Sequence, residues 1–375
     1  MSASLSIRGV DKIYHPPGRS AVHAVKALSM DVEGGEIVAL LGSSGCGKTS
    51  TLRMVAGFED VSAGAITLAN RRVERLAPAA RDVAMAFEGY SLYPPLTVRE
   101  NIAFALKRGR LSAGDAARRV QEIAALVEIE PILDRYPNAI SGGQQQRASL
   151  ARALVRDAAL YVLDEPMGQL EPQLRAVLRG RLKRLLKDRG MTSIFVTHDQ
   201  TEANALADRI AVMEGGILQQ FAGQHDLKER PANLYVATFI GEPPMNVFDA
   251  AVVRTDDRTI FELDDGPSFG FGDNELGPEV RQAIGGRRKI VIGVRPHRIM
   301  LGHGCGETAR IVSNQWLGDQ SHVAMAVAGK LLVAVSHVRV KAAIGDSVPY
   351  GVRAQDLHIF DPDTTVALAH GARAA

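Results

Sequence analysis

The sequence predicts an α/β domain built around a parallel sheet, followed by a smaller all-β domain. Within the first 235 residues, short continuous apolar runs alternate with longer amphipathic stretches, and a glycine-rich loop joins one run to a helical stretch. After residue 240 the apolar runs are short, β-like and separated by Gly- and Asp-rich turns. A chain of 375 residues has room for about two or three domains, so we place the domains at 1–235 and 236–375.

Four continuous apolar runs are the expected strands of the parallel sheet: Ile37–Leu41, Leu160–Leu163, Ser193–Val196 and Ile210–Met213. Runs without alternation suit strands that are buried on both faces. A helix with Asp115 as its N-cap is expected where apolar residues recur at helical spacing, at Val120, Ile123, Ala124 and Val127.

The second domain is expected to be a small barrel-like module. Its clearest strands are Lys289–Val294, His322–Val327 and Leu331–Val335, and short strands at this spacing are typical of small barrels. The C-terminal segment 367–375 is expected to fray.

The composition and charge of the chain exclude several classes of protein. The net charge is +2, so no strong field recruits nucleic acid or anionic lipid. The longest stretch without a charged side chain is 11 residues, whereas a membrane-spanning helix needs about 20 mostly apolar residues. Two cysteines cannot build a disulfide framework, and the first residues lack the apolar core of a secretory signal. We therefore expect a protein of the cytoplasm.

The loop at residues 42–49 matches the phosphate-binding pattern G-x-x-x-x-G-K-T. It lies where a predicted strand turns into a helix, so its N–H groups can point at one phosphate near the positive end of the helix dipole. Lys48 would reach the β- and γ-phosphates, and the Thr49 hydroxyl would ligate Mg²⁺. The predicted ATP-binding residues here are Gly42, Ser43, Ser44, Gly45, Cys46, Gly47, Lys48, Thr49 and Ser50.

Two carboxylates follow the apolar run that ends at Leu163. Asp164 suits a contact to Mg²⁺, and Glu165 suits the polarisation of an attacking water. His198 follows another predicted strand, and the ligand crevice of a parallel sheet lies at the carboxyl ends of its strands. We therefore expect His198 to hold the γ-phosphate.

The segment Ser141–Arg147 reads SGGQQQR. Ser141 and Gln144 form a capping-box pattern that opens a helix at 144–155. The glycines Gly142 and Gly143 leave the helix N-terminus bare, which creates a second anion site. One nucleotide cannot use both anion sites of one chain, but two chains paired head to tail would each offer Ser141 to the other's γ-phosphate.

These motifs together resemble the ATP-binding subunit of an ABC transporter. The resemblance implies a helical subdomain at about 89–158, Walker A at 42–49, the signature motif at 141–147, Walker B at 160–165 and a switch histidine at His198. Tyr14 matches the aromatic residue that stacks on adenine in that family. The segments 229–246, 294–297, 317–322 and 356–361 resemble maltose-type and glycerol-3-phosphate-type importers with a TOBE-type regulatory domain.

The resemblance also implies partners and a location. It implies a second ATPase subunit, identical or different, two transmembrane permease subunits and, indirectly, an extracytoplasmic solute-binding protein. The chain would lie at the cytoplasmic face of the plasma membrane and act on the permeases through a groove near residues 90–94. The cargo would be a sugar, a polyol or glycerol-3-phosphate; polyamine, sulfate and iron importers share the layout and stay as alternatives.

The sequence departs from the family pattern at several positions. Glu88 stands where the family has the Gln that contacts Mg²⁺, so a charged ligand would replace a neutral one. Ile140 replaces Leu, segment 167–171 reads MGQLE where Ser-Asn-Leu-Asp is usual, and segment 222–226 replaces a Gly-Thr-Pro turn. These changes mean either drift with activity kept or a subunit weakened at one site and paired with a different ATPase.

ABC ATPases of DNA repair or translation are the alternative class. The former insert a long coiled coil before the signature, whereas only 53 positions separate Glu88 from Ser141 here. The latter carry two cassettes, and this chain has one. Both features favour a transporter subunit.

Overall fold

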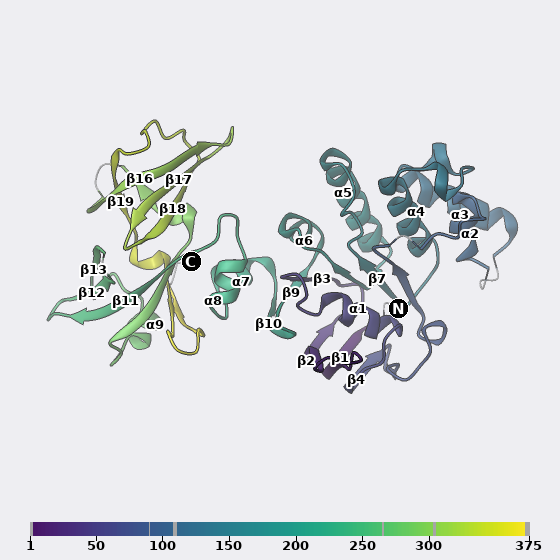
Figure 1. Ribbon diagram of the computed structural model, residues 1–375, viewed down its shortest axis with the longest axis horizontal. Helices are drawn as coiled ribbons and strands as arrows, with labels where there is room; N and C mark the ends of the chain where they lie inside the picture. Colours follow the sequence, from purple (N-terminus) through teal and green to yellow (C-terminus); the bar gives the residue numbers. More distant parts are fainter. Residues whose placement is uncertain (1–2, 90, 108–110, 265, 303–304, 372–375) are drawn as a thin grey trace. The chain divides into compact units, whose positions relative to one another are not determined.

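The computed structural model describes residues 3–89, 91–107, 111–264, 266–302 and 305–371. The chain forms two compact units, 1–224 and 225–375 (Figure 1). Residues 225–235, which the sequence analysis places at the end of the first domain, belong to the second of these units. In the described ranges, no helix is both long enough and apolar enough to span a membrane.

A six-stranded, mostly parallel sheet forms the centre of the first unit. Its strands, in spatial order, are β10 (Ile217–Ala222), β9 (Arg209–Glu214), β3 (Ile37–Gly42), β8 (Ser193–Val196), β7 (Leu160–Asp164) and β6 (Val83–Ala86). All neighbours are parallel except β9 and β10. The four predicted strands are confirmed within one residue at each end. Because β3, β8 and β7 are adjacent, their carboxyl ends meet at one edge of the sheet.

A second, antiparallel sheet packs into the same core. It consists of β2 (Val22–Val32), β1 (Leu5–Tyr14), β4 (Ala63–Leu68) and β5 (Arg71–Arg72), in that spatial order. Buried side chains of β1, β2 and β4 form one cluster with those of β3, β7, β8 and α1 (Lys48–Ala56). The cluster holds the second half of α1, through Leu52, Met54 and Val55, against both sheets.

Three helices of the first unit pack against one another (Figure 1). In the sequence they lie between β6 and β7. They are α2 (Val98–Phe104), α3 (Ala113–Leu126) and α4 (Gly142–Leu154). The N-cap of α3 is Ser112, whose hydroxyl accepts the Asp115 N–H. The prediction of Asp115 as N-cap is therefore wrong, because the helix begins one turn earlier at a residue that is an equally good cap.

The remaining elements of this unit are helices and 3₁₀ turns that connect the strands and the other helices. They are α5 (Pro172–Asp188), α6 (Gln200–Leu206) and the 3₁₀ turns η1 (Pro78–Ala80), η2 (Glu130–Ile132) and η3 (Pro137–Ala139). Helix α5 follows β7, and α6 follows β8.

In its described residues, the second unit contains two antiparallel sheets and three short helices. One sheet has the order β13 (Ser268–Gly272), β12 (Arg258–Leu263), β11 (Asn246–Arg254), β14 (Lys289–Val294), β20 (Leu357–Phe360) and β21 (Ala367–His370). The other has the order β15 (Met300–Leu301), β19 (Ser347–Gly351), β16 (Glu307–Trp316), β17 (Ser321–Val327) and β18 (Lys330–Ser336). The helices are α7 (Gln224–Glu229), α8 (Leu234–Phe239) and α9 (Pro278–Ala283), with the 3₁₀ turns η4 (Pro296–Arg298) and η5 (Ala354–Asp356).

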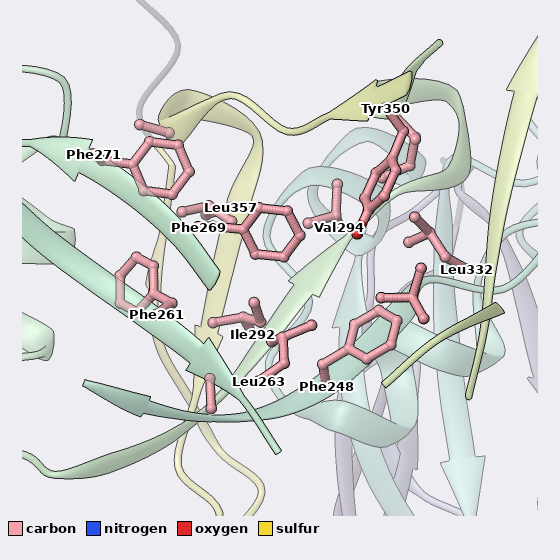
Figure 2. Close-up of a cluster of buried hydrophobic side chains, with 14 of the residues drawn as sticks. Phe248, Phe261, Leu263, Phe269, Phe271, Ile292, Val294, Leu332, Tyr350 and Leu357 are labelled. Atoms are coloured by element: carbon pink, nitrogen blue, oxygen red, sulfur yellow. The ribbon is translucent and has the colours of Figure 1, made fainter. Parts of the chain in front are cut away.

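Side chains from both sheets fill one core in the second unit. Figure 2 shows Phe248, Phe261 and Phe269 of the first sheet in the same buried cluster as Tyr350 of the second. The prediction of a small all-β domain is confirmed. The expected fraying of the C-terminal segment is wrong for 367–370, because these residues pair with β20 as strand β21.

Candidate functional site

The loop between β3 and α1 is closely packed around its glycines. Gly47 has φ +100°, and a Cβ there would lie 2.4 Å from the carbonyl oxygen of Ala24 on β2. A Cβ at Gly42 would lie 2.1 Å from the carbonyl oxygen of Met213 on β9. Side chains are therefore excluded at both ends of the loop, where its backbone lies directly against β2 and β9.

Lys48 is buried at the first position of α1. Its Nζ donates hydrogen bonds to the carbonyl oxygens of Gly42, at 2.9 Å, and Ser43, at 2.8 Å. The ammonium is therefore folded back over the loop, with no carboxylate among these partners. A phosphate oxygen is a stronger acceptor than a carbonyl for such a charge, so the arrangement fits a triphosphate.

The other predicted loop residues differ in their partners and burial. The Ser43 hydroxyl donates to the Glu214 carboxylate on β9. Cys46 is buried, and burial raises the pKa of its thiol. The Thr49 and Ser50 side chains are half-buried in the first turn of α1, while Ser44 and Gly45 are exposed.

The end of β7 carries a buried carboxylate without a partner. Asp164 is 4% exposed, and its Oδ1 accepts no hydrogen bond among the described residues. Burial raises its pKa to about 6, with further contributions from the negative charges of Glu88 and Glu165, while the Arg53 and Lys48 charges act in the opposite direction. Two negative charges therefore act on Asp164 against two positive ones, and a bound cation would offset the repulsion among the three carboxylates.

Glu165 and His198 meet at the carboxyl edge of the sheet. His198 Nδ1 lies 3.2 Å from Glu165 Oε1. The imidazole is 69% exposed and the glutamate side chain 27% exposed, so both can reach a ligand. The Glu165 backbone N–H donates to the carbonyl oxygen of Val196 on β8 at 3.0 Å, which ties the ends of β7 and β8 together.

Tyr14 lies at the end of β1, half-buried against α1. Its hydroxyl lies 2.8 Å from Ser50 Oγ and also donates to the Glu59 carboxylate. Burial raises the pKa of the phenol. The ring is thus held beside the first turn of α1, and its stacking on adenine stays a prediction.

The signature residues form a separate group at the start of α4. The Ser141 hydroxyl accepts the Gln144 N–H at 3.4 Å, and Gln144 Oε1 accepts the Ser141 N–H at 3.0 Å. The predicted capping box is therefore confirmed, and the helix starts at Gly142, earlier than predicted. Ser141 is exposed and both glycines are half-buried, so this N-terminus is open to an external anion.

Two side chains that the sequence analysis does not assign lie between these motifs. Gln146 on α4 and Arg175 on α5 both bond to the backbone of residues 165–170, which follow β7. The only sequence indication for Gln146 is its place within SGGQQQR, and for Arg175 there is none.

The predicted contact groove begins at Tyr90, which lies outside the described residues. Next to it, the Tyr93 ring lies 4.8 Å from the Phe104 ring and 5.5 Å from the guanidinium of Arg152.

The fold and site define a P-loop nucleoside triphosphatase with a β-rich second domain. Residues 25–168 match the ABC transporter family, and residues 292–360 match the TOBE domain. The trehalose import ATP-binding protein SugC of Mycobacterium tuberculosis is 43% identical over 300 residues, which cover 79% of this chain and 73% of that protein. The sn-glycerol-3-phosphate import ATP-binding protein UgpC of Chromobacterium violaceum is 38% identical over 372 residues, covering 99% of this chain and 97% of that protein.

Other relatives and solved structures agree. The xylose/arabinose import ATP-binding protein XacK of Haloferax volcanii is 37% identical, with 98% of this chain and 95% of that protein covered. The dimeric structure of MJ0796, a bacterial ABC transporter cassette, has a TM-score of 0.55 and 28% identity, covering 58% of this chain and 98% of that chain. This chain belongs to the ABC transporter family, as an ABC-type ATPase and ATP-binding import subunit with a TOBE domain.

Proposed function

We propose that this chain binds ATP and Mg²⁺ between the loop at 42–49 and the carboxyl end of β7, and that hydrolysis there powers import. The observation that carries the proposal is the buried, unpartnered Oδ1 of Asp164, which has the charges of Lys48, Glu88 and Glu165 around it. Thr49, Glu88 and Asp164 would ligate the metal together with phosphate oxygens, because Mg²⁺ usually takes only one or two carboxylates from a protein.

Each residue then has one task in the reaction. Lys48 leaves its two carbonyl partners for the β- and γ-phosphates, and the loop amides hold the phosphates in place. Glu165 orients the attacking water and accepts its proton, and His198 holds the γ-phosphate. A bound Mg²⁺ would neutralise charge on the transferring phosphoryl group.

The exposed start of α4 supports a shared site between two chains. Ser141 with the amides of Gly142, Gly143 and Gln144 would face the γ-phosphate bound by a second ATPase subunit, identical to this chain or different. Two chains would close around two ATP molecules and reopen after phosphate leaves. The solved cassette structure described as dimeric supports this arrangement.

The roles of the relatives support the choice of cargo and partners. We propose import of a sugar, a polyol or glycerol-3-phosphate, because trehalose, pentose and glycerol-3-phosphate import are named for relatives aligned over most of this chain. The chain would sit at the cytoplasmic face of the plasma membrane against two permease subunits, with an external solute-binding protein delivering the cargo.

Glu165→Gln tests the proposal. The change is nearly isosteric and removes only the carboxylate that orients water, so ATP affinity should change by less than about twofold while kcat falls at least about a hundredfold. The variant should also accumulate as an ATP-bound dimer, measured by size-exclusion chromatography with and without ATP.

Glu122→Gln, on the exposed side of α3, is the matched control and should keep wild-type turnover. Unchanged turnover in Glu165→Gln would remove Glu165 from this role. Loss of ATP binding in the same variant would show that Glu165 holds the nucleotide instead.

A further inference from the structure

Gln146 lies in the signature helix, but its side chain is directed to the chain's own Walker B segment. It is 4% exposed. Its Nε2 donates to the carbonyl oxygen of Glu165 at 2.7 Å, and its Oε1 accepts the Gln169 N–H at 3.0 Å. One amide thus uses both its donor and its acceptor to hold the backbone on either side of segment 166–168.

Glu165 needs such a restraint because its backbone is strained. Its φ is +46°, in the left-handed region that non-glycine residues rarely adopt. Backbone in this region persists only where the surroundings determine it. The Glu165 N–H is held by Val196 on β8, and its carbonyl accepts from Gln146 and, at 3.3 Å, from Gly168.

The rest of this segment has its own support. Arg175 Nη2 donates to the carbonyl oxygens of Gly168, at 3.2 Å, and Leu170, at 3.1 Å, and its Nη1 lies 3.3 Å from Asp199 Oδ2. Loss of the Gln146 side chain would therefore leave segment 168–170 anchored to α5. The specific consequence would be that the Glu165 carbonyl keeps only the longer hydrogen bond from the Gly168 N–H, at 3.3 Å, and that the direction of the Glu165 side chain is less defined.

We infer that Gln146 is a positioning residue for Glu165: although it lies in the motif that would serve the partner's nucleotide, its amide fixes the catalytic carboxylate of its own chain. This inference rests on the proposed role of Glu165 as the base. It separates two functions of α4, with Ser141 acting outward at the helix start and Gln146 acting inward one turn later.

Gln146→Met is the test variant, because methionine keeps the length and volume of the side chain and removes both hydrogen bonds. We expect kcat to fall at least about tenfold, with KM and ATP affinity changed less than about twofold, because only the direction of the base is affected. In a Glu165→Gln background the same substitution should leave ATP-driven dimer formation intact and should not lower the residual turnover further, because Gln146 acts through Glu165.

Gln146→Glu tests the two hydrogen bonds of the Gln146 amide separately. It keeps an acceptor for the Gln169 N–H but places an oxygen against the Glu165 carbonyl, so it should be as inactive as Gln146→Met. Gln121→Ala removes a side-chain hydrogen bond from α3 to Glu130 and should keep wild-type turnover.

The outcomes are distinct. Wild-type kcat in Gln146→Met, or full activity in Gln146→Glu, would overturn the inference. Loss of ATP-driven dimers in the double variant would assign Gln146 to the signature function instead and would also overturn it. If Glu165→Gln alone keeps its turnover, the proposed function fails, whatever Gln146 does.

Discussion

Replacing Glu202 by glutamine should remove a pH-dependent penalty from the stability of the first unit. Glu202 lies on α6, 2% exposed. Its Oε2 accepts the Thr197 hydroxyl at 2.8 Å, while its Oε1 has no partner among the described residues. Burial raises the pKa of this carboxyl to about 7, and the nearby Asp199 charge contributes in the same direction.

The sign and size of the effect follow from linkage. Below the ordinary pKa of 4.5 the carboxyl is protonated in both states, so it adds no pH dependence. Between that value and about 7 the unfolded chain loses the proton while the folded chain keeps it, so the free energy of unfolding falls as pH rises. At about 1.4 kcal/mol for each pH unit the loss totals about 3 kcal/mol, and it is constant at higher pH.

Urea unfolding of the wild type and Glu202→Gln at pH 5 and pH 8 measures this penalty. The buried amide of Gln carries its own cost, which does not change with pH, so the comparison between the two pH values is the relevant quantity. Circular dichroism follows the helices, which are mostly in the first unit. The single tryptophan, Trp316, lies in the second unit, so its fluorescence is an internal control that should be unaffected. Equal pH dependence in both proteins would refute the reasoning.

The other predictions concern the nucleotide site. Glu88→Gln should lower the pKa of Asp164, because it removes a neighbouring negative charge. The variant should need several-fold more Mg²⁺ for half-maximal ATPase activity and should bind ATP more tightly in the absence of metal. Its turnover should be largely kept. Superimposable Mg²⁺ titrations would show that Glu88 has no part in the metal site. Gly47→Ala should abolish ATP binding, measured by nucleotide titration, and should lower stability by more than the about 1–3 kcal/mol of backbone strain alone, because its Cβ would also lie 2.4 Å from the Ala24 carbonyl oxygen. Gly45→Ala, with φ +79° but open space at its Cβ, should cost only that backbone strain in thermal melting. Ser141→Arg should spare ATP binding by monomers and prevent ATP-driven dimers, read by size-exclusion chromatography; a loss of monomer binding would contradict the shared site.

The sequence predicted the parts of the first unit whose pattern is local. Strands β3, β7, β8 and β9 are continuous apolar runs because both faces of the sheet are covered. The predicted bounds of β8 agree with the observed bounds at both ends. The capping box at Ser141 was also predictable, since Ser and Gln three residues apart are enough to form it.

The parts that sequence reasoning missed depend on contacts between distant segments. The antiparallel sheet of β1, β2 and β4 was not predicted from the sequence, because bulges in its register interrupt the alternation of buried residues. The role of Gln146 was hidden for the same reason: its partners at 165 and 169 become neighbours only when α4 packs beside β7. The pairing of β21 with β20 likewise joins a tail of weak pattern to a buried strand.

The order of strands in the parallel sheet also determines when the site can form during synthesis. Strand β3, which leads into the phosphate-binding loop, is separated from β7, which bears Asp164, by β8, and Ile37 pairs with Ser193. Contacts between residues so far apart in sequence form late, because a long loop must close first. A nascent chain that has emerged only as far as α5 would hold the loop and the carboxylates but lack the strand that joins them. Nucleotide binding would therefore begin only after β8 has left the ribosome and inserted between its two neighbours.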